Sequence, residues 1–363
     1  MRFPAGKRRM QKHLVPQGFS SLGLLVVPGV NGIRKAGCRE TINGYNVRRA
    51  LAPLTGGHPV RRGRKDRPMP LDSELVGTAS DLVSAEVDAG WTMAYAAGLG
   101  DALPCYLDTT RARGIIAHPM FSVAIESPAM MQIIQVLREA GFPRHEMLRR
   151  VHATDEVIVH RLIRPPERLF TRATLAGIER SKAGAYHLTR FDTTDEKGAP
   201  VCTTWYGNLY RGVEVAGPDR PPADAPALLA PSAGAAAAQA SFAIPISPVA
   251  AHIYGACARL GNPVNIHTDM ATAKNAGLPG TILHGTATLA MAVSRVIAAA
   301  AGGDPTRVAR IHARFGAMVL MPSEIELRIS ARERAAAGDA VFFEVLSADG
   351  GRAIRDGFVV LRA

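Results

Sequence analysis

The sequence predicts an α+β protein built from two tandem copies of one unit, and three observations support this prediction. Tyr95-Ala-Ala-Gly is matched by Tyr254-Gly-Ala-Cys at an offset of 159 residues. Arg150-Val-His-Ala is matched by Arg310-Ile-His-Ala at an offset of 160 residues. The order of predicted elements also repeats: strand, short helix, polar loop, Pro/Gly-rich connection, long apolar helix, then several strands. Because a helix that is apolar on nearly every side must be enclosed, we expect each mostly antiparallel sheet to curl around its long helix.

Charge is concentrated at the start of the chain. The 363 residues are 47% hydrophobic, enough for two domains with their own cores, and carry a formal net charge of +12. Residues 1–70 hold fifteen Lys/Arg and two acidic residues, so the other 28 Lys/Arg and 29 Asp/Glu leave residues 71–363 nearly neutral. A basic arm that binds nucleic acid or an anionic membrane is one interpretation, but the segment lacks interleaved aromatic residues. We expect a disordered extension without nucleic-acid binding.

Membrane insertion and export are not indicated. No window of about 18 residues is apolar and uncharged, so we predict no membrane span. The apolar stretch 22–30 follows basic residues, as in a secretion or import signal, but it contains Gly23 and Pro28 and lacks a clear cleavage site. The four cysteines are far apart and form no CxxC motif, which favours reduced thiols, a cytoplasmic protein and no metal site.

Hydrophobic periodicity and turn residues give the elements of the first repeat. We expect a strand at 82–87, a helix at 89–99, a polar loop at 100–108 and a long helix at 121–137. Strands are then expected at 150–160, 168–179, 183–192 and 201–210. The Pro- and Ala-rich composition of 214–238 predicts a linker. The predicted domains are therefore a basic extension (1–75), a first repeat (76–213), the linker (214–238) and a second repeat (239–363).

The second repeat contains the block richest in chemically useful side chains. A polar loop from Asn262 to Asp269 is followed by a Pro/Gly-rich connection and by an apolar helix that starts after His284-Gly285. A short helix is expected at 270–276, with Asp269 as its N-cap. An acid/base group beside a helix N-terminus suits reactions of a carbonyl-activated substrate.

The residues of this block resemble a known family. Tyr254-Gly-Ala-Cys-Ala-Arg, Asn262-Pro, Ile266-His-Thr-Asp, Ala276-Gly-Leu-Pro and Ile282-Leu-His-Gly are similar to the signature of MaoC-like (R)-specific enoyl-CoA hydratases/dehydratases. The resemblance covers residues 76–363, with the first half similar to the family's degenerate N-terminal repeat, and implies a double hot-dog fold. It also implies a hydro-lyase of fatty acid metabolism that acts on acyl-CoA thioesters, needs no metal or redox cofactor and forms a homodimer or hetero-oligomer of hot-dog units.

The reactive loop departs from the family pattern, which has the form Asp-x-Asn-Pro-x-His. With Asn262-Pro263 aligned, the family's aspartate falls on Leu260 and two additional residues precede His267. With His267 aligned without gaps, Asn262 occupies the aspartate position instead. Under either alignment, the acidic partner of the histidine is missing.

Hydration of an enoyl thioester requires a base for water, a proton donor at Cα and stabilisation of the enolate oxygen. We assign His267 as the acid/base, Asn262 as the group that orients water or substrate, and the Gly285 N–H as the oxyanion donor. The candidate substrate-binding residues are His284, Asp269 and Arg259. The alternative roles are that His284 holds the helix start and that Asp269 caps the next helix.

Two other functions stay open at this stage. A thioesterase would need a carboxylate, Asp101 or Asp269, facing the central helix. A non-catalytic acyl-CoA-binding or partner subunit would explain the missing aspartate, and another hot-dog chain could supply it. A second active site is not expected, because Leu103 and Tyr106 replace Asn and His in the first repeat, and we expect Asp101 to lie far from His267.

Overall fold

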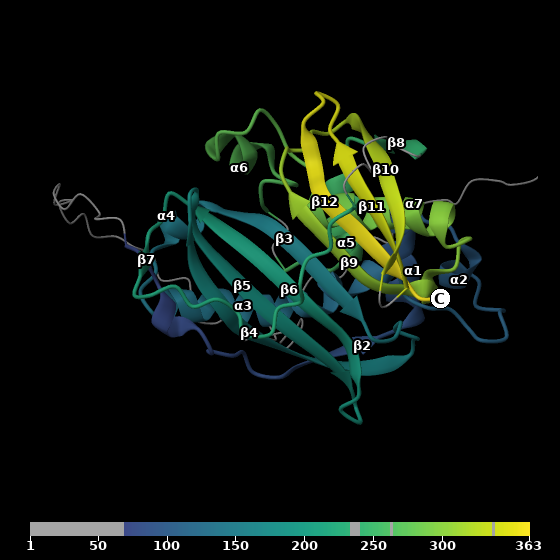
Figure 1. The fold of residues 1–363 in the computed structure, drawn as a ribbon, viewed down its shortest axis with the longest axis horizontal. Helices are drawn as coiled ribbons and strands as arrows, with labels where there is room; N and C mark the ends of the chain where they lie inside the picture. The colour runs from purple at the N-terminus through teal and green to yellow at the C-terminus, as the bar shows by residue number, and fades with distance from the viewer. Residues whose placement is uncertain (1–68, 233–239, 262–263, 336–337) are drawn as a thin grey trace, which may run out of the picture. The chain divides into compact units, whose positions relative to one another are not determined.

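The computed structural model describes residues 69–363, apart from residues 233–239, 262–263 and 336–337. The N-terminal extension, for which we predicted disorder, therefore lies almost entirely outside the described residues. Figure 1 shows two similar α+β units joined through their sheets.

The first repeat follows the predicted order closely. Every predicted strand and helix of this repeat is found within about three residues of its expected bounds. Its elements are β1 (Leu71–Asp72), η1 (Ser73–Leu75), β2 (Val83–Val87), α1 (Ala89–Gly98), α2 (Pro104–Leu107), η2 (Pro119–Phe121), α3 (Ser122–Glu139), α4 (Arg144–Met147), β3 (Arg150–Val159), β4 (Glu167–Ser181), β5 (Gly184–Asp195), β6 (Pro200–Arg211) and β7 (Val215–Ala216).

The second repeat has the same sequence of strand, short helix, long helix and four strands. Its elements are β8 (Ala240–Ile246), α5 (Ala250–Cys257), α6 (Met270–Asn275), α7 (Gly285–Ala300), η3 (Pro305–Arg307), β9 (Val308–Phe315), β10 (Ser323–Ala335), β11 (Gly338–Leu346) and β12 (Arg352–Leu361). Strands β5 and β6 form one antiparallel hairpin, and β11 and β12 form another.

One ten-stranded antiparallel sheet joins the two repeats. The strand order is β2-β4-β5-β6-β3-β9-β12-β11-β10-β8, so each repeat contributes five neighbouring strands and the central contact is β3 with β9. Helix α3 packs on β4, and α7 packs on β9, β10, β11 and β12. The fold is a double hot-dog, as the resemblance implies.

Two pairs of equivalent residues mark an approximate two-fold axis between the repeats. Thr154 pairs with Arg314 at one end of the β3–β9 ladder, and these residues are 160 positions apart, the offset at which the Arg150 and Arg310 segments match. The hydroxyls of Tyr95 and Tyr254, 159 positions apart, lie 3.5 Å from each other. Residues that match in the two sequence repeats therefore lie next to each other in the structure.

The two long helices differ in what they bury. Helix α7 buries residues around most of its circumference, which are mainly Ala, Val, Leu, Ile and Met. Helix α3 instead buries Glu126, whose Oε1 accepts a hydrogen bond of 2.6 Å from the Thr204 hydroxyl. The segment Pro119–Glu139 is long and apolar enough to cross a membrane by composition alone, but half of it is buried within the protein, as expected of a core helix.

The folded part extends beyond the predicted domain boundaries. Strand β1 lies within the predicted extension and pairs in parallel with β7, which lies in the predicted linker. The linker also contacts the sheet, since Arg220 bridges to Ile178 and Arg310 donates to the carbonyl of Ala227. The composition of residues 214–238 indicated that this segment has no long helix or strand, and its described part, residues 214–232, contains none. It did not indicate that the segment contacts the sheet.

The buried carboxyl of Glu126 predicts a pH-dependent stability. Burial raises its pKa from an ordinary 4.5 to about 7, so the fold favours the protonated form and stability is lost as pH rises from about 4.5 through 7. Glu126→Gln should unfold in urea with a free energy similar to that of the wild type at pH 5. At pH 8 it should be more stable by about 1–3 kcal/mol, because the neutral amide carries no burial cost for a charge.

Glu139→Gln is the matched control, because Glu139 lies on the same helix but is exposed. If both variants show the same pH dependence as the wild type, the buried carboxyl is not the cause.

Candidate active site

The N-terminus of α7 lacks a side-chain cap. His284 occupies the N-cap position but its side chain makes no capping hydrogen bond, and the first turn closes with Thr288 N donating to the His284 carbonyl at 3.0 Å. The N–H groups of Gly285 and its neighbours therefore have no acceptor within the helix. Together with the helix dipole, they form a site for developing negative charge.

His267 lies beside this helix start. Its Nδ1 lies 2.9 Å from the Ile282 carbonyl, and since a carbonyl only accepts, Nδ1 carries the proton. Its backbone N–H donates to Asn265 Oδ1 at 2.8 Å. Burial lowers the pKa of His267, partly offset by the Ile282 bond, so the neutral ring presents a lone pair at Nε2.

His284 stacks on His267, with ring centroids 3.8 Å apart and an interplanar angle of 25°. Burial, with contributions from His267 and His252, lowers the pKa of His284 to about 2. Its Nδ1 is buried without a protein hydrogen-bond partner. The structure thus brings two neutral histidines together where the sequence predicted one acid/base and one substrate-binding residue.

Two residues hold these groups in place. Tyr254 is buried 5.3 Å from the His284 ring, and its hydroxyl donates to Thr286 Oγ1 at 3.0 Å. His252 Nε2 donates to the Thr268 carbonyl at 2.9 Å and so ties α5 to the reactive loop. His252 is not among the predicted site residues; its only sequence signal is its position in the first turn of the helix that carries Tyr254.

Position 285 has little room for a side chain because a neighbouring aromatic ring lies close to it. A Cβ at this position would lie 3.0 Å from the ring of Phe315, which is tighter than an ordinary contact. Phe315 ends β9 and also contacts the His152 ring at 4.5 Å, while His152 stacks on Tyr206 at 3.6 Å. The aromatic wall in front of the helix start therefore comes from both repeats, which the sequence analysis did not anticipate.

The other candidate residues lie in different surroundings. Asp269 caps α6 by accepting from Thr272 N at 2.7 Å and Thr272 Oγ1 at 2.6 Å, as the alternative interpretation expected. Arg259 stacks on the Trp91 ring at 4.0 Å and lies 3.9 Å from Asp88. Asn262 lies outside the described residues, so its role stays a prediction.

His267 has no carboxylate within 4.0 Å among the residues that the structure describes. Asp101 does not approach it and instead accepts from Leu103 N at 3.2 Å, with its second oxygen buried and unpartnered. The expectation that Asp101 does not serve His267 agrees with this geometry, and the missing acidic partner is not replaced within the described residues.

In the first repeat, the histidine at the equivalent helix start is held by hydrogen bonds. His118 Nδ1 accepts from Met120 N at 3.1 Å, and its Nε2 lies 3.1 Å from Ser294 Oγ on α7. Tyr106 is buried 5.6 Å from the His118 ring at the position of the family's histidine. Both nitrogens of His118 are therefore engaged, which supports the expectation of a single active site.

No group of three or more His, Cys, Asp or Glu side chains is placed to hold a metal within the described ranges. Three of the four cysteines are described, and each is a free thiol.

Each of the two repeats matches a known protein family. The family described as "MaoC like domain" matches residues 235–345, and the family described as "FAS1-like, dehydratase domain region" matches residues 74–204. A search of curated protein sequences finds no match.

Solved structures share the fold at low sequence identity. A MaoC-like dehydratase from Phytophthora capsici is 19% identical with a TM-score of 0.65, covering 78% of this chain and 96% of its own. Full-length peroxisomal multifunctional enzyme type 2 from Drosophila melanogaster is 19% identical with a TM-score of 0.60, covering 78% of this chain and 48% of its own. A putative MaoC domain protein dehydratase from Chloroflexus aurantiacus is 12% identical with a TM-score of 0.57, covering 79% and 96%. The second repeat therefore matches a MaoC-like domain and the first a FAS1-like dehydratase region, on a double hot-dog fold.

Proposed function

We propose that this protein is a hydro-lyase that reversibly adds water to a 2-enoyl-CoA thioester. The observation that carries the proposal is the neutral His267–His284 pair at the uncapped N-terminus of α7. This arrangement offers a base and an oxyanion site side by side. The resemblance of the reactive loop to (R)-specific hydratases gives the substrate class.

In the hydration direction, His267 Nε2 takes a proton from water while the water oxygen bonds to Cβ of the enoyl group. The negative charge that develops on the thioester oxygen is stabilised by the Gly285 N–H and the helix dipole. The same proton then passes from His267 to Cα, so that the elements of one water molecule are added across the double bond. Asn262 orients the water in this proposal, and no metal or redox cofactor takes part.

The absence of a carboxylate near His267 among the described residues makes proton transfer by this histidine more costly. An imidazolium forms at His267 in the transition state, and burial disfavours that charged form. A partner carboxylate would offset the cost, so we expect turnover by this chain alone to be slow. We therefore retain, as the alternative function, a non-catalytic acyl-CoA-binding or partner subunit of a cytoplasmic homodimer or hetero-oligomer. Pairing with another hot-dog chain that carries the aspartate would reconcile the missing group with activity.

The thioesterase alternative is weaker. It requires a water-activating carboxylate from Asp101 or Asp269 facing the central helix. Asp269 is occupied as the cap of α6, and Asp101 lies in the loop of the first repeat beside Leu103.

The first test is hydration of crotonyl-CoA and longer enoyl-CoAs, followed by loss of the conjugated thioester absorbance. His267→Ala should lower kcat by about 10²-fold or more, because it removes the base proposed to activate water. His145→Ala is the control, because His145 is half exposed on α4 of the first repeat.

Equal rates in the wild type and His267→Ala would remove this residue from the mechanism. Release of free thiol without hydration would favour the thioesterase, and binding without either reaction would favour the partner subunit.

Gly285 gives a second test. Gly285→Ala should lower hydration at least about tenfold, because the new Cβ meets the Phe315 ring and shifts the N–H groups that face the thioester. Combining it with Phe315→Leu should restore part of the rate. The control is Gly261→Ala, where an added Cβ meets no atom within 4 Å. Wild-type activity in Gly285→Ala would contradict the role of this helix start.

A further inference from the structure

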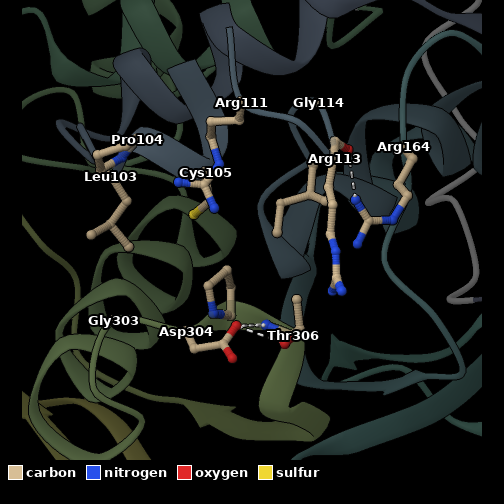
Figure 2. A pocket seen from close by; sticks show the side chains of 12 residues that line it. Leu103, Pro104, Cys105, Arg111, Arg113, Gly114, Arg164, Gly303, Asp304 and Thr306 are labelled. Carbon is tan, nitrogen blue, oxygen red and sulfur yellow. Dashed lines mark hydrogen bonds between the residues drawn. The ribbon is translucent and has the colours of Figure 1, made fainter. Parts of the chain in front are cut away.

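A cavity of about 300 Å³ lies away from the histidine pair, between the loops of the first repeat and the segment that follows α7. Figure 2 shows three arginines around it: Arg111 and Arg113 from the loop after α2, and Arg164 from the loop before β4. The facing wall is formed by Asp304 and Thr306 of the second repeat.

The positive charge of this cavity is not neutralised by its surroundings. Within the described part of the chain, none of the three guanidinium groups lies within 4.0 Å of a carboxylate. Arg164 Nη1 donates instead to the backbone carbonyl of Arg113 at 3.3 Å, which ties the Arg164 side chain to the loop that carries Arg111 and Arg113. Asp304 is the only acidic residue in the wall, and its Oδ1 is occupied by Thr306 N at 2.9 Å and Thr306 Oγ1 at 2.6 Å.

Three other arginines of the same repeat form ion pairs. Arg161 reaches Glu167 at 2.8 Å, Arg180 reaches Asp219 at 2.7 Å and Arg190 reaches Asp192 at 2.7 Å. Three unpaired arginines around one hollow repel each other, and an anion between them would remove that cost. Planar guanidinium groups also match phosphate oxygens in geometry.

The rest of the lining is apolar or small. Leu103, Pro104 and Ile116 contribute hydrophobic surface, and the Cys105 thiol faces the same space beside Arg111. A small organic group attached to a phosphate would therefore find contacts that inorganic phosphate cannot use.

This cavity is separate from the histidine pair. It lies beyond the C-terminal end of α7, whereas the histidines lie at its N-terminus, and sixteen helical residues span about 24 Å. It is built on the loop of the first repeat that corresponds to the reactive loop of the second. Because Tyr106 and the engaged His118 replace the reactive groups there, the cavity offers binding without chemistry.

We propose that this cavity is a second ligand site, which binds the phosphate groups of a small phosphorylated molecule through Arg111, Arg113 and Arg164. The proposal does not depend on the hydratase activity, because it involves no residue of the histidine pair.

The test uses Cys105 as a reporter inside the cavity and Cys257, another half-buried thiol, as the internal control. Full-length protein is treated with iodoacetamide, and modification of each cysteine is followed by mass spectrometry with pyrophosphate or adenosine 3′,5′-bisphosphate added. Both probes should slow modification of Cys105 at least threefold and leave Cys257 unchanged. Stronger protection by the bisphosphate would identify a nucleotide ligand, and equal protection would identify the phosphate groups alone.

Protection should be lost in Arg113→Ala and Arg164→Ala, each tested singly because both side chains are exposed. It should persist in Arg355→Ala, an exposed arginine on β12, and in His267→Ala. Absence of Cys105 protection at millimolar probe, or protection unchanged in both arginine variants, would overturn the proposal.

Discussion

The pairing of β3 with β9 is the interaction on which the rest of the structure depends. It joins two five-stranded sheets into one, and Glu156 consolidates it by accepting from Arg310 Nε at 2.6 Å and lying 3.2 Å from His312 Nδ1. The same pairing carries Phe315, at the end of β9, to the His152 ring of β3 and to the surface of Gly285. The candidate active site of the second repeat is thus completed by a wall from the first, so neither repeat alone would contain it.

Duplication followed by divergence explains the unequal chemistry of the two repeats. The first repeat uses its helix-start histidine as a cap and carries buried carboxyls, Glu126 and Asp155, whose pKa values burial raises. The second repeat leaves its helix start uncapped and buries an almost entirely apolar helix. The first repeat therefore uses its polar groups internally, while the second repeat keeps backbone donors available for a ligand.

The fold could be predicted from the sequence because it depends on local patterns, namely hydrophobic periodicity, turn residues and an internal repeat. These patterns can be recognised without knowledge of tertiary contacts. The apolar run behind His284 led directly to α7, and the matched Arg-x-His-Ala segments identified β3 and β9 as equivalent strands, although not as neighbours. The cap formed by Asp269 is a local contact with Thr272, and the sequence indicated it. What the sequence could not supply were contacts between distant residues, namely the His267–His284 stack and the Phe315 wall. The arginine-lined cavity escaped prediction for the same reason, since Arg111, Arg113 and Arg164 come from two loops and face residues about 140 or more positions away.

The central claim is that the uncapped start of α7 and the Nε2 of His267 act on the two ends of an activated acyl group. A crystal structure with bound (3R)-hydroxybutyryl-CoA tests it most directly. The account predicts the thioester oxygen within about 3.1 Å of the Gly285 N–H and the 3-hydroxyl within hydrogen-bond distance of His267 Nε2. A thioester bound elsewhere, or a hydroxyl that faces away from His267, would contradict it.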